Sequence, residues 1–140
     1  MSTIGMLELL APYTVYLALL LRVVVGATMA MHGYPKLKSP QQTVQWTKGL
    51  GVPVVATYLA IILEFFGGIA LVIGFLVPIV AFFLALEMIG NTLLKKVKMK
   101  AHYLQMTEHA YEIDITYLLL AITLLVLGAG AFSLDALLGF

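Results

Sequence analysis

The sequence contains no cysteine, and only 11% of its 140 residues are charged. The lack of cysteine excludes disulfide bonds, thiolate metal sites, covalently attached haem and iron–sulfur clusters held by this chain alone. In soluble domains about a quarter of the residues are charged, so the low fraction of charged residues here indicates another class of protein. There is also no basic run interleaved with aromatic residues, and no nucleic-acid partner is predicted. A chain of this length supplies one domain, covering residues 1–140.

Long apolar runs take up most of the chain, in which 62% of residues are hydrophobic and the mean hydropathy is +1.05. Runs of about 20 apolar residues are long enough to cross the hydrocarbon core of a bilayer. The predicted fold is therefore all-α, an integral membrane four-helix bundle with helices at about residues 13–34, 53–74, 78–94 and 111–128. Pro35 is expected to end the first helix, and the break at Gly74–Pro78 separates the second helix from the third.

Short segments at the membrane interface are predicted at both ends of the chain. The opening residues MSTIGMLELLAP lack the basic n-region of a secretory signal and are expected to form an interfacial lead-in. Near the other end, Ser133 is expected to cap a short surface helix at residues 133–138. Residues 36–52 are predicted to form a polar loop in which Trp46 anchors the chain at the interface.

The lysines predict the topology. All seven lie in the connections after the first and third predicted helices, which in a bundle of four crossings face the same side. By the positive-inside rule these lysine-rich loops are cytoplasmic, and both termini are outside. The expected location is the cell membrane, with the lipid bilayer as the main surrounding partner.

Three charged residues fall near the middle of the predicted helices, namely Arg22, Glu64 and Glu87. At a rise of about 1.5 Å per residue, all three are expected near the bilayer midplane. A guanidinium cannot shed its proton there, so Arg22 is expected to face the bundle interior and pair with Glu64 or Glu87. Asn91 follows Glu87 on the same helix face. The predicted buried polar cluster, a candidate site for a quinone or for proton transfer, is therefore Arg22, Glu64, Glu87 and Asn91.

Two carboxylates near one arginine favour a functional role for this cluster. One of them is expected to hold a proton, because burial without a partner disfavours the charged form. A protonated carboxyl can donate a hydrogen bond, relay a proton or anchor a polar headgroup inside the membrane. The alternative is structural, since a single buried Arg–Glu pair can simply fix the register of packed helices. No catalytic residue is assigned.

A second polar layer is predicted nearer the cytoplasmic ends of the helices, formed by His32, Lys36, Glu112 and Asp114. His32 lies close to a helix end, where a histidine is more often hydrogen-bonded than bound to a metal. The other two histidines lie in the second lysine-rich segment, and no two histidines have the spacing of a transmembrane haem site. Neither a metal nor haem is predicted.

Four stretches of this sequence, taken in order, resemble the DoxX-like family. LRVVVGATMAMHGYPKL is similar to its first-helix signature of arginine, glycine and His-Gly followed by lysine. GVPVVATYLAIILEFFGGIALVIGF resembles its second helix, AYEIDITYLLLAI the Tyr-Glu opening of its fourth helix, and GAGAFSLDALL its Gly-x-Gly and Ser-Leu-Asp ending. Together these stretches run through nearly the whole chain.

The resemblance implies a four-helix integral membrane protein. The family takes its name from small membrane subunits of thermoacidophilic archaea tied to terminal quinol oxidase and thiosulfate:quinone oxidoreductase, and its bacterial members are linked to quinones or redox stress. The polar positions that match the family type are Arg22, His32, Lys36, Glu64 and Glu112. One departure is the lysine-rich third connection, which lacks the usual Gly-Gly before Tyr-Glu.

The leading hypothesis is a membrane subunit of a quinone-linked respiratory or sulfur-oxidising oxidoreductase complex. In it, the buried cluster would hold a quinone headgroup or relay protons. The possible cofactor is a quinone, and the expected partners are other membrane subunits or further copies of the chain. No redox centre is evident in the sequence, so electrons have to come from a partner or a bound cofactor. The alternatives are a small proton-coupled membrane transporter and an assembly or scaffold protein.

Overall fold

A computed structural model of the chain describes residues 9–104 and 110–140. Within these residues the fold is all-α and contains no strand, as predicted. In the same part of the chain, three helical segments are long and apolar enough to cross a membrane: Ala11–Lys38, Val54–Ile73 and Val77–Val97. Membrane-spanning helices are therefore supported for three of the four predicted crossings.

The helices follow the order of the predicted runs, with additions. A short 3-10 turn, η1 (Ala11–Tyr13), leads into α2 (Thr14–Lys38), which is followed by α3 (Pro40–Gly49). The next long segment is made of α4 (Val54–Ile62), the π-helical turn η2 (Leu63–Gly67) and α5 (Gly68–Ile73). The chain then forms α6 (Val77–Val97), α7 (Glu112–Leu127) and α8 (Leu134–Leu138).

The helix α7 packs along α6 and also contacts α2, but it is the shortest of the long segments. Its 16 residues extend over about 24 Å at the rise of an α-helix. This is less than the hydrocarbon thickness of about 30 Å. The predicted helix at 111–128 is thus present, whereas its role as a fourth complete crossing is not established by its length.

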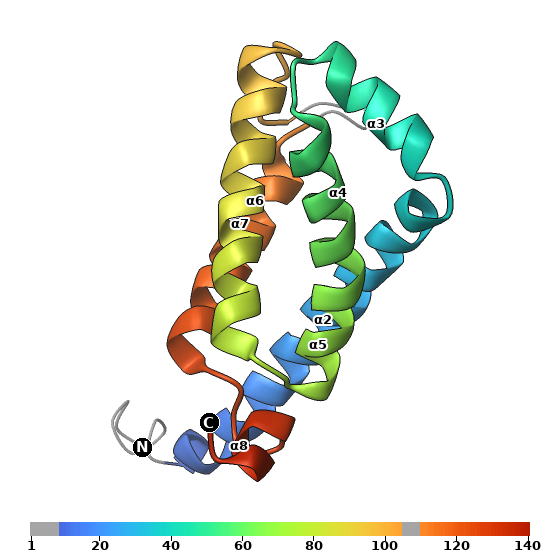
Figure 1. Cartoon of the computed structure of the whole chain (residues 1–140). Coiled ribbons are helices and arrows are strands. Elements are labelled where there is room, and N and C mark those ends of the chain that lie inside the picture. Colours follow the sequence, from blue (N-terminus) through green and yellow to red (C-terminus); the bar gives the residue numbers. More distant parts are fainter. Residues whose placement is uncertain (1–8, 105–109) are drawn as a thin grey trace.

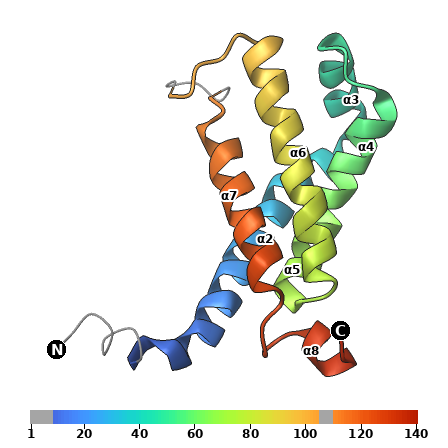
Figure 2. The same ribbon diagram turned by 90° about the vertical axis from the view of Figure 1, so that its left-hand side faces the viewer.

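The two ends of the molecule differ in charge. Figure 1 shows α8 and the first turns of α2 at one end, and α3 with the last turns of α6 at the other. Figure 2 shows α2 running obliquely across the other long helices. The seven lysines lie at the end of α2, in α3, and in or just after the last turn of α6. We call these two ends of the molecule the α8 end and the lysine end.

Glycines allow α2 to pack directly against the backbone of η2 and α5. A Cβ atom placed on Gly26 would lie 2.5 Å from the carbonyl oxygen of Gly68, and one on Gly33 would lie 2.6 Å from the nitrogen of Phe65. Small residues of this kind let membrane helices approach closely. The remaining core joins α2, α5, α6 and α7 through buried apolar side chains: Val25, Met29, Leu71, Val77, Ala81, Leu84, Ala85, Met88, Ala121 and Leu124.

The prediction that Pro35 ends the first helix was wrong. α2 continues to Lys38, although Pro35 has no N–H to donate to the preceding turn. Two contacts stabilise this last turn, since Ser39 donates its backbone N–H to the Pro35 carbonyl at 3.2 Å and Lys36 forms an ion pair with Glu64. The predicted loop at 36–52 was also wrong, because α3 occupies most of it and begins at Pro40, a favoured first helical position for proline.

The other predicted boundaries agree closely with the structure. The helix predicted at 53–74 is the α4–η2–α5 segment, although its π-helical turn was not predicted. The helices predicted at 78–94 and 111–128 correspond to α6 and α7. Ser133 caps α8 as expected, accepting a hydrogen bond from the backbone N–H of Ala136 at 3.1 Å. Most of the predicted N-terminal lead-in, residues 1–8, lies outside the described residues.

Candidate functional site

A cavity of about 1180 Å³ lies between α2, α3, α4–η2, α6 and α7, toward the lysine end of the molecule. It exists because α6 packs against α7, α5 and η2 but has little contact with α4. Its volume is sufficient for a ligand of the size of a drug or cofactor. Most of its lining is apolar, and its polar lining residues are His32, Lys36, Gln42, Thr43, Trp46, Thr47, Thr57, Glu64, Glu87, Asn91, Lys95, Asp114 and Tyr117.

An ion pair connects α2 to the wall formed by η2. The Nζ atom of Lys36 lies 2.5 Å from Oε1 of Glu64, and the two side chains are 39% and 5% exposed, respectively. Glu64 belongs to the π-helical turn, where one additional residue per turn changes the direction in which side chains point. Its other oxygen, Oε2, is buried and has no hydrogen-bond partner among the described residues.

The carboxyl group of Glu87 is the most unusual polar group of the cavity. Both of its oxygens are buried and accept no hydrogen bond from an N–H or hydroxyl group of the described residues, but the carboxyl lies within hydrogen-bonding reach of the Glu64 carboxyl group. The charged groups that interact with it are Glu64, Lys36 and Asp114. A buried polar group without a partner costs about 1–3 kcal/mol, which a ligand can recover by hydrogen bonding. Glu87 is therefore the group at which a polar ligand would gain most.

A second ion pair closes the cavity between α6 and α7. Lys95 Nζ lies 2.7 Å from Oδ2 of Asp114 and also donates to the carbonyl oxygen of Ala110 at 3.4 Å. On the α2 side, the rings of His32 and Tyr117 meet edge to face with their centroids 6.3 Å apart. The cavity is thus bounded by charged and aromatic groups from three helices.

The structure merges most of the two predicted polar layers into one site. Glu64, Glu87 and Asn91 from the first layer line the same cavity as His32, Lys36 and Asp114 from the second. Glu112 lies in the first turn of α7 but does not line the cavity. The only other predicted member that lies outside the cavity is Arg22.

Arg22 is buried at the α8 end and is held by the C-terminal segment. Its Nη1 atom donates to the carbonyl oxygen of Ala129 at 2.7 Å, and its Nη2 atom donates to that of Phe132 at 2.5 Å. The guanidinium also lies against Gly74, where an added Cβ would collide with it. Backbone carbonyls therefore provide the hydrogen bonds that a carboxylate was expected to provide.

The expected contact of Arg22 with Glu64 or Glu87 does not form. Glu64 lies ten residues before Gly74 in the same helical segment, about 15 Å along its axis. The prediction estimated the depth of Arg22 in the bilayer from a first helix that begins at residue 13 and runs parallel to its neighbours. In the structure, α2 crosses its neighbours obliquely (Figure 2). Arg22 is consequently not part of the cavity.

Asp135 is a buried charged residue whose contacts the sequence did not predict. Its two carboxylate oxygens accept hydrogen bonds from the backbone N–H groups of Leu76 and Val77, at 2.7 and 3.0 Å, where α6 begins. Its own N–H donates to the carbonyl oxygen of Gly74 at 2.9 Å, and it interacts electrostatically with Arg22. Asp135 is the only acidic residue of the apolar C-terminal tail and follows the helix cap Ser133 by two positions. This isolation was the sequence feature from which a structural role of Asp135 could have been predicted.

Seven polar residues of the cavity lining were not predicted as site residues: Gln42, Thr43, Trp46, Thr47, Thr57, Lys95 and Tyr117. Lys95 could have been found from its spacing, because it follows Glu87 by eight residues and Asn91 by four on one helix face. Trp46 and Tyr117 gave no such signal, since aromatic residues near helix ends are usual at membrane interfaces. Among the described residues, no group of three or more histidine, aspartate or glutamate side chains is arranged to hold a metal ion.

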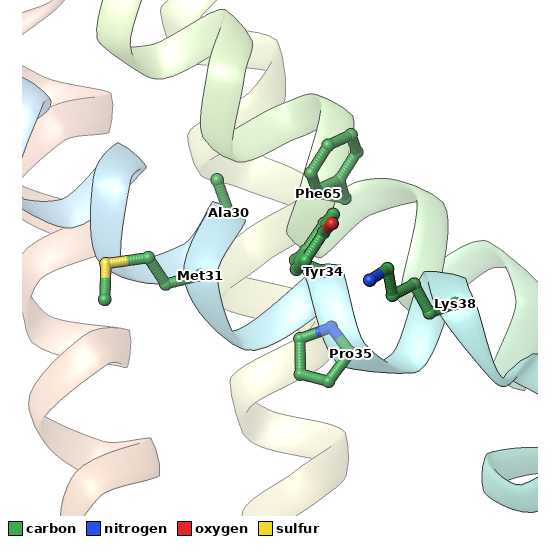
Figure 3. Close-up of a pocket in the computed structure, with 6 residues that line it drawn as sticks. All are labelled: Ala30, Met31, Tyr34, Pro35, Lys38 and Phe65. Atoms are coloured by element: carbon green, nitrogen blue, oxygen red, sulfur yellow. The ribbon is translucent and has the colours of Figure 1, made fainter.

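A smaller hollow of about 560 Å³ lies on the outer side of α2 next to η2. Figure 3 shows that Tyr34 lies between Phe65 and Lys38 at this place, with Met31 and Pro35 completing its edge. The Lys38 ammonium lies 5.0 Å from the centre of the Tyr34 ring, a cation–π contact. The hollow has no acidic residue in its lining, so we take the cavity with Glu87 as the candidate site.

Residues 17–96, from the first turns of α2 to the last turn of α6, match the DoxX family. This chain belongs to the DoxX family. The matched region includes the Lys36–Glu64 ion pair and Glu87, but not α7 or the C-terminal segment that holds Arg22. The DoxX core of this protein thus contains most of the cavity wall.

Two curated relatives align with most of this chain, and the name of one describes a membrane protein. The chain is 32% identical over 105 residues to "Putative oxidoreductase CatD" of Bacillus subtilis, which covers 75% of this chain and 77% of the relative. It is 34% identical over 125 residues to "Inner membrane protein YqjF" of Escherichia coli, which covers 86% and 90%, respectively. Both relatives are bacterial. No solved structure gives a significant match. With its three apolar helices, this DoxX-family chain is a membrane protein.

Proposed function

We propose that this DoxX-family protein is a membrane subunit of a quinone-linked oxidoreductase complex and that its cavity holds a quinone headgroup. The observation that carries this proposal is the buried carboxyl pair of Glu87 and Glu64 inside a large, mostly apolar cavity, in which Glu87 receives no hydrogen bond from an N–H or hydroxyl group of the described residues. A protonated Glu87 can donate to a quinone carbonyl, and its carboxylate can accept from a quinol hydroxyl. The name of the Bacillus subtilis relative, "Putative oxidoreductase CatD", agrees with redox chemistry.

Proton exchange with the headgroup is the second part of the proposal. Glu87 interacts with Glu64, which is paired with Lys36, and with Asp114, which is paired with Lys95. These ion pairs lead from Glu87 to two lysines whose side chains are partly exposed. A quinone that gains two electrons also takes up two protons; Glu87 can deliver one proton at a time and must be reprotonated from water between the two transfers. The chain itself supplies no redox centre to this scheme, so the electrons come from a partner.

Transport of a substrate across the membrane is less well supported. Alternating access needs an opening at both ends of the bundle. At the α8 end, the hydrogen bonds of Arg22 and Asp135 connect the C-terminal segment to α2, α5 and α6. A scaffold role does not account for the buried Glu87 carboxyl, which has no N–H or hydroxyl donor among the described residues. We therefore favour the quinone site over both alternatives.

Loss of quinone binding on replacing Glu87 is the expected test result. Trp46 is the only tryptophan of the chain and lines the cavity, and quinones quench excited indole at short range. A tail-less benzoquinone should therefore quench Trp46 fluorescence saturably in the purified protein. Glu87→Leu removes the hydrogen-bonding group and should weaken the binding about tenfold or more.

Glu112→Leu is the matched control for this test, because Glu112 is a half-buried glutamate that does not line the cavity. It should bind the quinone as the wild type does. Equal binding by Glu87→Leu and wild type would contradict the role of Glu87. Quenching that never saturates in the wild type would contradict the quinone site altogether.

We further propose that α7 completes a fourth crossing, with the lysine end in the cytoplasm and both termini outside. The support is that the seven lysines lie in the last turn of α2, in α3, and in or just after the last turn of α6. The chain has no cysteine of its own, so Ser39→Cys at the lysine end and Ala131→Cys at the α8 end give single labelling sites. In intact cells, a membrane-impermeant maleimide should label Ala131→Cys only. Labelling of Ser39→Cys alone would reverse the topology.

A further inference from the structure

The cavity reaches the lipid-facing surface between α4 and α6. The helix α6 contacts α5 and η2 near the α8 end, but it has little contact with α4 nearer the lysine end (Figure 1). The cavity lining includes residues of both α4 and α6 along this stretch. The space between the two helices is therefore a side on which helix packing does not close the cavity.

Large apolar side chains line the cavity at this opening and are themselves about half exposed. The exposed fractions are 61% for Leu59, 49% for Ile62 and 53% for Phe66 on the α4–η2 side. On the α6 side they are 51% for Phe83 and 50% for Leu86. A residue that both lines the cavity and faces outward lies at its rim, so the rim toward the lipid is apolar.

The charged groups lie deeper in the same cavity. Glu64 is only 4% exposed, and the oxygens of Glu87 are buried. Along α6, Leu86 and Gly90 of the lining are exposed, whereas Asn91 and Lys95 of the lining are partly buried. The cavity thus changes from apolar at the lipid side to polar at the inside, which is the profile of an amphipathic molecule.

We propose that the opening between α4 and α6 is a lateral entrance for a ligand with a hydrocarbon tail. The headgroup would lie beside Glu87, and the tail would extend past Phe66 and Phe83 into the bilayer. This inference rests on the proposed function for its headgroup, and it adds that the natural ligand is lipid-tailed and enters from the membrane. Moving the tail from lipid to an apolar rim gains little free energy, because lipid is equally apolar. The entrance therefore decides whether the headgroup can reach Glu87 while its tail remains in lipid.

Gly90 offers a way to block this entrance without disturbing the fold. It lines the cavity on α6, and a Cβ atom added to it meets no other atom within 4 Å. The phenylalanine side chain of a Gly90→Phe variant would therefore extend into the opening without moving the backbone. Ile89→Phe is the matched control, since Ile89 is the next residue of α6, is 43% exposed and does not line the cavity.

The test compares two ligands in lipid nanodiscs by quenching of Trp46 fluorescence. One is a tail-less benzoquinone, and the other has the same headgroup and a long isoprenoid tail. Gly90→Phe should weaken binding of the tailed quinone about tenfold or more and that of the tail-less quinone less than about threefold. Ile89→Phe should change neither.

The possible failures separate the two proposals. If Gly90→Phe leaves both quinones unaffected, or weakens both equally, lateral entry of a tailed ligand is wrong while the quinone site stands. If neither quinone gives saturable quenching in the wild type, the proposed function itself is wrong. Native mass spectrometry of each variant verifies that it remains folded and bound to lipid.

Discussion

Gly68→Ala is expected to destabilise the protein by about 3 kcal/mol, although it adds only a methyl group. A Cβ atom at this position would lie 2.5 Å from the nitrogen of Ala30 and 2.6 Å from the carbonyl oxygen of Gly26. Both atoms belong to the backbone of α2, which cannot move aside as a flexible side chain can. The two helices would have to separate, and the packing between α2 and α5 would be lost along several turns.

Gly90→Ala is the matched control for this prediction. It makes the same chemical change in a helix, but at a position with no neighbouring atom within 4 Å. It should be neutral or stabilise the helix by about 0.5–1 kcal/mol, because alanine favours helices over glycine. The free energy of unfolding can be measured by circular dichroism in mixed detergent micelles. Equal stability of the two variants would contradict the close backbone contact.

Asp135→Ala is expected to cost about 3–5 kcal/mol of stability, the range for removal of one partner from a buried charged network. The variant leaves the N–H groups of Leu76 and Val77 without acceptors at the start of α6. It also removes the only acidic group that interacts with Arg22 among the described residues, and Arg22 is just 2% exposed. The same unfolding experiment in mixed micelles measures the loss.

Two further variants make this prediction specific. Asp135→Asn keeps an oxygen that can accept one of the two N–H groups, so its stability should lie between those of the alanine variant and the wild type. Glu112→Ala removes a carboxylate from the first turn of α7 and should cost about 1 kcal/mol or less. If Asp135→Ala unfolds at the same denaturant concentration as the wild type, the C-terminal segment is not a structural connection.

The extent of the helices could be predicted because it depends on local properties of the sequence. Apolar runs, the break at Gly74 and the cap at Ser133 gave boundaries within a few residues for α5, α6, α7 and α8. The errors occurred where tertiary contacts outweighed local preference. The last turn of α2 forms after Pro35 because Lys36 pairs with Glu64, a residue of another helix, and no local rule contains that contact.

The site was predicted in part for the same reason. Glu64, Glu87 and Asn91 line one cavity, as their spacing and expected depth indicated. Arg22 was placed with them because a buried arginine was expected to require a carboxylate. Its actual acceptors are main-chain carbonyls of Ala129 and Phe132, more than a hundred residues further along the chain. Carbonyl groups are present at every position, so the sequence contains no specific signal for such a partner.

The π-helical turn at Leu63–Gly67 affects how this helix compares with those of relatives. Such a turn accommodates one additional residue, which rotates everything after it by about 100° relative to a regular helix. A relative without it would need one codon fewer here, and an alignment would need a one-residue gap. Glu64 faces the cavity and Gly68 packs against α2 from adjoining parts of the same helical segment. A single-codon insertion or deletion at the π-helical turn would therefore rotate one of these parts relative to the other.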